Sequence, residues 1–201
     1  MTGQDAEQIS DVGPVQAEGG ADQLADVEPD FDTGADTGAG QRPDAKVVAE
    51  LLGREPKGHF EVVVRSGDGT PVVIRNAPLL DDGTPMPTMF WLLDRDLNKR
   101  IGRLESTGGV KQAEADVAPE ELARAHEAYR AERDALIPPG WTGPRPFGGV
   151  GGTRRGVKCL HTHYAWFLAG GDDPVGRWVD ERLAPARPDA TVDAAEANGE
   201  L

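Results

Sequence analysis

The residues best suited to chemistry in this chain are gathered in one segment, FGGVGGTRRGVKCLHTHYAWFLAGG, which spans residues 147–171. It contains the only cysteine, Cys159, and two of the four histidines, His161 and His163. A thiol and two imidazoles are groups that ligate zinc and other divalent metals, and they are also groups of nucleophilic and acid–base catalysis. The segment therefore predicts either a metal site or a catalytic site at these three residues.

The spacing of the three residues leaves several interpretations open. On a regular helix Cys159 and His163 share a face, whereas His161 lies about 200° from Cys159, so the three converge only where the first turn is unwound. A thiol in the first turn of a helix, beside a lysine, is also placed to act as a nucleophile. In the third interpretation Cys159 is a small core residue, and the histidines lie at the surface or form hydrogen bonds.

A basic, glycine-rich stretch in front of this cluster indicates an anion site. No acidic residue occurs between Ala135 and Gly171. A helix is predicted to begin near Val157, where its free backbone N–H groups would attract negative charge, and arginine adds bidentate hydrogen bonds to phosphate oxygens. The alternative is a flexible linker with incidental basic residues. The predicted ligand-binding residues are Gly151, Gly152, Arg154, Arg155 and Lys158.

The strands that support this segment are indicated by β-branched runs. Two such runs flank the Asp68-Gly69 pair, which is typical of a tight hairpin turn. A third run is apolar on both faces, and this predicts the central strand of the sheet. The predicted strands are 59–66, 71–78 and 89–93.

Helices are predicted around these strands from apolar residues at helical spacing. Gly108-Gly109 is expected to end the second of them, and the third is amphipathic, with Arg124, Arg130 and Arg133 expected to face outward. Between the third and fourth, residues 138–156 are rich in glycine and proline, and we expect a functional loop there. The predicted helices are 44–52, 95–106, 118–136, 157–169 and 174–183. The fold class is therefore α+β, with a small antiparallel three-stranded sheet packed by about five helices.

Charge divides the chain into three parts. The formal net charge is −14, of which residues 1–41 carry −10 and residues 185–201 carry −3. These ends hold too little apolar surface to offset the entropy of ordering them, so we expect a disordered acidic arm and a disordered tail. Residues 42–184, with a net charge of −1, are expected to form a single globular domain.

Several classes of protein are disfavoured by composition. A single cysteine excludes an intramolecular disulfide. The sequence shows neither a signal peptide nor eighteen consecutive apolar residues, and we therefore expect a cytoplasmic protein with no membrane partner. A nearly neutral body with one basic segment also argues against nucleic-acid binding.

Four segments carry a resemblance to a known family. They are VVAELLGREPKG, DGTPMPTMFWLLD, IGRLESTGGV and GVKCLHTHYAWFLAGGDDPVG. Together they resemble the bacterial domain of unknown function 501 family, over about residues 45–180. The resemblance implies a small cytosolic protein of a kind common in actinobacteria. It also implies a gene context that includes enolase, a septum-formation initiator and an exopolyphosphatase.

The resemblance also bears on metal binding. Many relatives place cysteines at the positions of Ser66 and Asp94, which implies a metal-binding fold in which Asp94 replaces one thiolate here. We expect the protein to bind a phosphorylated or other small anionic ligand, with or without zinc or another divalent metal. The alternative is a non-enzymatic interaction module linked to cell division or polyphosphate metabolism.

Overall fold

The computed structural model describes residues 44–184 of the chain. The predicted acidic arm, 1–41, and tail, 185–201, lie outside the described residues. Their disorder and the proposed domain boundaries therefore stay predictions. Within 44–184, no helix is both long enough and apolar enough to cross a lipid bilayer.

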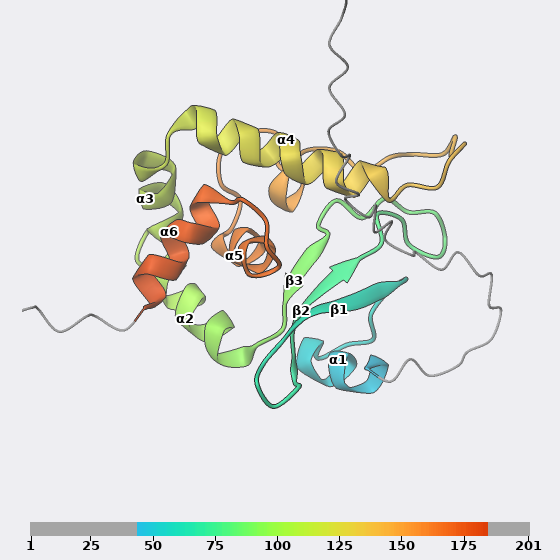
Figure 1. Ribbon diagram of the computed structural model, residues 1–201, viewed down its shortest axis with the longest axis horizontal. Coiled ribbons are helices and arrows are strands. Elements are labelled where there is room, and N and C mark those ends of the chain that lie inside the picture. Colours follow the sequence, from blue (N-terminus) through green and yellow to red (C-terminus); the bar gives the residue numbers. More distant parts are fainter. Residues whose placement is uncertain (1–43, 185–201) are drawn as a thin grey trace, which may run out of the picture. The chain divides into compact units, whose positions relative to one another are not determined.

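The sheet is antiparallel and has the order β1-β2-β3, as Figure 1 shows. The strands are β1 Phe60–Arg65, β2 Pro71–Asn76 and β3 Phe90–Leu92. The predicted hairpin between β1 and β2 is confirmed: the Asp68 carboxylate accepts hydrogen bonds from the Ser66 hydroxyl and the Thr70 N–H, and Gly69 has a φ of 86°.

The prediction that the third strand lies at the centre of the sheet is wrong. The central strand is β2, and β3 is an edge strand. Its apolar character has another cause, because helix α5 packs against β3 and buries Phe90 and Leu92. A helix can therefore give an edge strand the apolar pattern of a central one.

Six α-helices and one short 3₁₀ helix surround the sheet within residues 44–184. They are α1 Ala45–Leu52, α2 Arg95–Ser106, α3 Gly109–Asp116, α4 Pro119–Ala135, η1 Val150–Gly152, α5 Leu160–Leu168 and α6 Pro174–Leu183. The predicted α+β class with a small antiparallel sheet is confirmed. Helix α3 was not expected: Gly108, with a φ of 90°, turns the chain into a new helix after α2 has ended.

The two faces of the sheet pack on different helices (Figure 1). On one face Ile74 joins Phe60, Leu93 and Val48, the last from α1, in a small cluster. On the other face Val73 and Phe90 belong to the main core, which also contains residues of α4, α5 and α6. The rings of Tyr129, Trp166 and Trp178 fill this core. Tyr129 ties α4 to the sheet, because its hydroxyl accepts a hydrogen bond from the Met89 N–H.

Candidate functional site

The glycine-rich loop, residues 146–156, is bound to helix α4 through a buried arginine. Arg133 is 0% exposed. Its guanidinium donates to the carbonyl oxygens of Gly148, at 2.8 Å, and of Pro146 and Phe147, at 3.4 and 3.3 Å. Its charge is paired with Asp134, with a guanidinium N–O distance of 2.8 Å. The prediction that Arg133 faces outward is therefore wrong, and the loop is a folded structure rather than a flexible linker.

His126 is the second residue of α4 that holds this loop. Its Nδ1 accepts a hydrogen bond from the Val150 N–H at 3.1 Å, and its Nε2 lies 3.0 Å from the Gly156 carbonyl oxygen. Because a carbonyl can only accept, Nε2 carries the proton and the neutral ring satisfies both partners. Burial lowers the pKa of His126 below its ordinary value, which favours the same neutral form.

The loop approaches α4 so closely at Gly149 that no side chain fits there. A Cβ atom at this position would lie 2.5 Å from Nδ1 and 2.7 Å from Cα of His126. At Gly151, whose φ is 65°, the chain needs the left-handed conformation that glycine adopts readily. The glycines therefore serve close packing and a tight turn.

Two cavities lie next to His126, and both are lined by His126, Ala123 and Arg154. The first has a volume of about 490 Å³ and the second about 380 Å³. The first is also lined by Glu127, Arg130, Pro146, Phe147, Gly148 and Gly149. The second is also lined by Glu114, Val117, Pro119, Leu122, Arg155 and Gly156. We call the two together the α4–loop cleft.

The charges of the α4–loop cleft are only partly neutralised. Arg130 is paired with Glu127 at 2.5 Å. Arg154 and Arg155 have no acidic partner within residues 44–184, and the guanidinium of Arg154 lies 5.7 Å from the centre of the Phe147 ring. Two of the predicted anion-binding residues thus line one cleft and remain available to a ligand.

The other predicted anion-binding residues lie elsewhere. Lys158 donates to the carbonyl oxygen of Gly151 at 3.1 Å and lines neither cavity of the cleft. Gly151 and Gly152 belong, with Val150, to the 3₁₀ turn η1 and line neither cavity of the cleft. They shape the loop, while its cleft-facing glycines are Gly148, Gly149 and Gly156.

The start of helix α5 differs from the prediction and already carries a carboxylate. The helix begins at Leu160 rather than at Val157, because Cys159 is extended, with a φ of −157°. The Leu160 N–H donates to Glu105 Oε1 at 2.6 Å, and the Val157 N–H donates to Glu114 Oε1 at 2.6 Å. Acidic residues of α2 and α3 therefore occupy the positions at which an external anion was expected. An acid-free stretch of sequence did not mean an acid-free surface.

The two predicted histidines serve different contacts. His161 Nδ1 lies 3.2 Å from Glu105 Oε1, and its Nε2 lies 3.3 Å from the Asn98 carbonyl oxygen. His163 is 1% exposed, and its Nδ1 lies 2.7 Å from Oδ2 of the fully buried Asp173. The other oxygen of Asp173 caps α6 by accepting from the Val175 and Gly176 N–H groups at 2.9 Å.

His163 has one nitrogen without a partner. Its Nε2 is buried and makes no hydrogen bond to a described residue. The ring meets that of His126 edge to face, with centres 5.8 Å apart. A carboxylate that fixes Nδ1–H leaves Nε2 as a base, the orientation used in acid–base catalysis, but His163 lines neither cavity of the cleft.

The predicted metal ligands do not form one set in this arrangement. Cys159 Sγ contacts the Thr162 hydroxyl at 3.4 Å, and Asp94 caps α2 by accepting from the Leu97 N–H at 2.8 Å. Within residues 44–184, no three His, Cys, Asp or Glu side chains are grouped so that they could hold a metal ion. The donors as placed do not fit a zinc site.

His126 and Arg133 were missed as site residues, although their spacing held a signal. Both lie on the side of α4 that carries Leu122 and Tyr129, since 122, 126, 129 and 133 follow one another at intervals of three or four. This spacing places a histidine and an arginine on the buried face. The buried position of Arg133 was missed because every arginine of this helix was assigned to the outer face.

Comparison with known proteins places the chain in a family. The chain belongs to the family described as protein of unknown function (DUF501), whose model matches residues 62–181. The matched range runs from β1 to α6 and includes the whole α4–loop cleft. No curated protein and no solved structure gives a significant match to the chain.

Proposed function

We propose that this protein binds a small phosphorylated or other anionic ligand in the α4–loop cleft. The observation that carries the proposal is the position of Arg154, which lines both cavities and has no acidic partner within residues 44–184. Arg155 adds a second such cation at the second cavity. Guanidinium groups keep their charge at every physiological pH and form paired hydrogen bonds with phosphate oxygens.

The packing of the loop supports a binding role. Arg133 and His126 fix the loop backbone from beneath, so little chain entropy is lost when a ligand binds. A volume of about 490 Å³ is also in the range of small-molecule sites, which is roughly 300–1,000 Å³. A preformed cleft with unpaired cations suits a small anion.

The second cavity favours one alternative, an interaction module that binds a protein segment. Its wall contains the apolar residues Val117, Pro119 and Leu122 beside Arg155. A module of this kind would show affinity for a partner without turnover. An enzyme would in addition convert members of a panel of phosphorylated substrates, so product analysis separates the two functions.

The test is phosphate binding by the full chain and its arginine variants. Arg154→Ala combined with Arg155→Ala should weaken the binding of inorganic phosphate by roughly tenfold or more, since a hydrogen bond to a charged group contributes about 1.5–3 kcal/mol. Isothermal titration calorimetry at low salt measures the loss. Melting temperature should change little, because exposed charges contribute little to stability.

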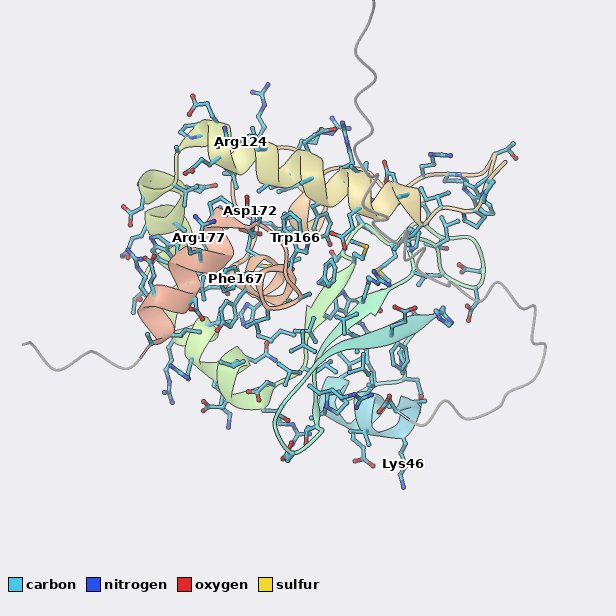
Figure 2. The ribbon with its side chains drawn as sticks, in the orientation of Figure 1. Lys46, Arg124, Trp166, Phe167, Asp172 and Arg177 are labelled. Carbon is cyan, nitrogen blue, oxygen red and sulfur yellow. The ribbon has the colours of Figure 1, made fainter. Side chains whose placement is uncertain are left out.

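A matched control is Arg124→Ala. Arg124 also lies on α4 (Figure 2), is exposed, and is 3.9 Å from Glu121, but it lines neither cavity of the cleft. Its substitution deletes one positive charge, as each single substitution of the tested pair does, and should leave phosphate affinity within about twofold. Absence of phosphate binding by the unmodified protein at millimolar concentration would refute the proposed function. Equal losses in both variants would show that the effect is general electrostatic attraction.

A further inference from the structure

The first cavity of the α4–loop cleft presents an aromatic ring to solvent. Phe147 is 59% exposed, and it is the one aromatic residue among the large exposed hydrophobic residues of the described chain. Its backbone is held, because its carbonyl oxygen accepts from the buried Arg133. A single exposed apolar side chain is common on protein surfaces. Here the ring also lines a cavity, and its backbone is fixed from the protein interior.

A cation lies next to this ring. The guanidinium of Arg154 lies over one side of the Phe147 ring, 5.7 Å from its centre, and both residues line the cavity of about 490 Å³. Within this cavity, then, a site for an anion and a flat apolar face are adjacent. Inorganic phosphate would contact the cation and leave the ring and most of this volume unused.

We propose that the ligand of the cleft is a phosphate monoester that carries a planar ring, the chemistry of a nucleoside monophosphate. This inference rests on the proposed function, because the phosphate is assigned to Arg154. The ring of the ligand stacks on Phe147, as bases stack on aromatic side chains in single-stranded nucleic-acid sites. One phosphate and one ring then use the two adjacent features of the cavity.

The hydrogen bonds of the loop limit how such a ring is recognised. Both ring nitrogens of His126 are engaged by the loop backbone, and the carbonyl oxygens of Phe147 and Gly148 accept from Arg133. The imidazole therefore has no nitrogen free to read the edge of a base, and each of these carbonyl oxygens keeps one lone pair. Stacking depends on a flat face rather than on edge groups, so both purine and pyrimidine monophosphates should bind.

The test compares four probes on the full chain by isothermal titration calorimetry: inorganic phosphate, ribose 5-phosphate, adenosine and adenosine 5′-monophosphate. Adenosine monophosphate should bind about tenfold more tightly than ribose 5-phosphate, in keeping with the usual contribution of base stacking. It should also bind more tightly than adenosine, which lacks the phosphate. Cytidine 5′-monophosphate should retain at least part of the advantage over ribose 5-phosphate.

Substitutions of Phe147 test whether its ring causes the tighter binding of adenosine monophosphate than of ribose 5-phosphate. Phe147→Leu keeps an apolar side chain without a ring and should reduce the preference for adenosine monophosphate over ribose 5-phosphate to about twofold or less, while inorganic phosphate binds as before. Phe147→Trp keeps a ring and should keep the preference. Because the side chain is exposed, these variants should fold, and their melting temperatures confirm it.

Each contrary result has a distinct meaning. Equal affinity for adenosine monophosphate and ribose 5-phosphate would overturn the planar-ring inference and leave the phosphate proposal standing. A preference that survives Phe147→Leu would also overturn the inference, because the ring would bind elsewhere. If adenosine binds as tightly as its monophosphate, or if none of the four probes binds, the phosphate assignment fails as well.

Discussion

Replacing Gly149 by alanine tests whether the loop is built against α4. The added Cβ would lie 2.5 Å from Nδ1 and 2.7 Å from Cα of His126. Because these atoms belong to the helix backbone and to a ring held at both nitrogens, they cannot move away as a flexible side-chain end would. The backbone φ at Gly149 is −93°, so the substitution probes close packing and not a left-handed conformation.

The magnitude follows from two losses. Forcing a methyl group into a packed contact costs about 1–3 kcal/mol. Moving the loop away from α4 also breaks the hydrogen bond from the Val150 N–H to His126, which contributes about 0.5–1.5 kcal/mol. Gly149→Ala should therefore lower the free energy of unfolding by about 2–4 kcal/mol, and the melting temperature by roughly 5–15 °C. Phosphate affinity should fall too, since Gly149 and His126 line the first cavity.

The same chemical change elsewhere provides the control. Gly102 lies within α2, and a Cβ there would meet nothing within 4 Å. Gly102→Ala should raise the free energy of unfolding by about 0.5–1 kcal/mol, because alanine is the better helix former. Urea unfolding monitored by circular dichroism measures both variants. If Gly149→Ala stays within about 0.5 kcal/mol of the unmodified protein, the loop is not fixed against α4 and the preformed cleft is refuted.

Three further predictions concern the buried and partly buried polar residues. Burial lowers the pKa of His126 below 6.5, so as the pH falls the unfolded chain binds this proton before the folded chain does. The contribution of neutral His126 to stability is therefore complete above about pH 6.5 and is lost as the pH falls from there through the lowered pKa. The decrease in unfolding free energy from about pH 7.5 to 5.5 should therefore be smaller in His126→Gln, and an equal decrease would contradict this. Asp173→Ala leaves His163 Nδ1–H and two cap N–H groups unpaired and should lower the free energy of unfolding by about 3 kcal/mol or more in urea. Its control is Asp172→Ala, at an exposed ion pair with Arg177 (Figure 2), which should lower it by less than about 0.5 kcal/mol. Similar losses in the two variants would refute the buried pair. Cys159→Ser should change stability by about 1 kcal/mol or less, and one equivalent of zinc in the purified protein that is lost on this substitution would show that the fold rearranges around a metal.

Most of the helices, strands and turns could be predicted from rules that involve only neighbouring residues in the sequence. The Asp68-Gly69 turn, the Asp94 cap and the apolar spacing of α2, α4 and α6 each depend on residues that are neighbours in the chain. Such rules failed where a distant element supplies the environment. Helix α5 gives β3 the burial of a central strand, and no periodicity within 89–93 reports this.

In the candidate site, too, local features could be predicted and features that depend on distant residues could not. Arg154 and Arg155, which the sequence singled out, do line one cavity of the cleft, and their role in binding stays a prediction. The electrostatics of the site could not be predicted from residues 147–171, because Glu105 lies 55 residues before the N–H group that it binds. The prediction that His161 and His163 act at one site failed for a similar reason. His161 contacts Glu105 of α2, while His163 contacts Asp173, which caps α6.

Side chains of α4 and α3, rather than a backbone ladder, hold the loop of the cleft, and this makes two amides informative in solution, one in the loop and one directly after it. The Val150 N–H is bonded to the imidazole of His126, and the Val157 N–H to the carboxylate of Glu114. Each proton exchanges with deuterium only while its hydrogen bond is open, so the two exchange rates report how often these contacts with α4 and α3 open. Mass spectrometry of the corresponding peptides would thus follow the opening of the cleft in the protein without any ligand, and a bound ligand would slow both amides together.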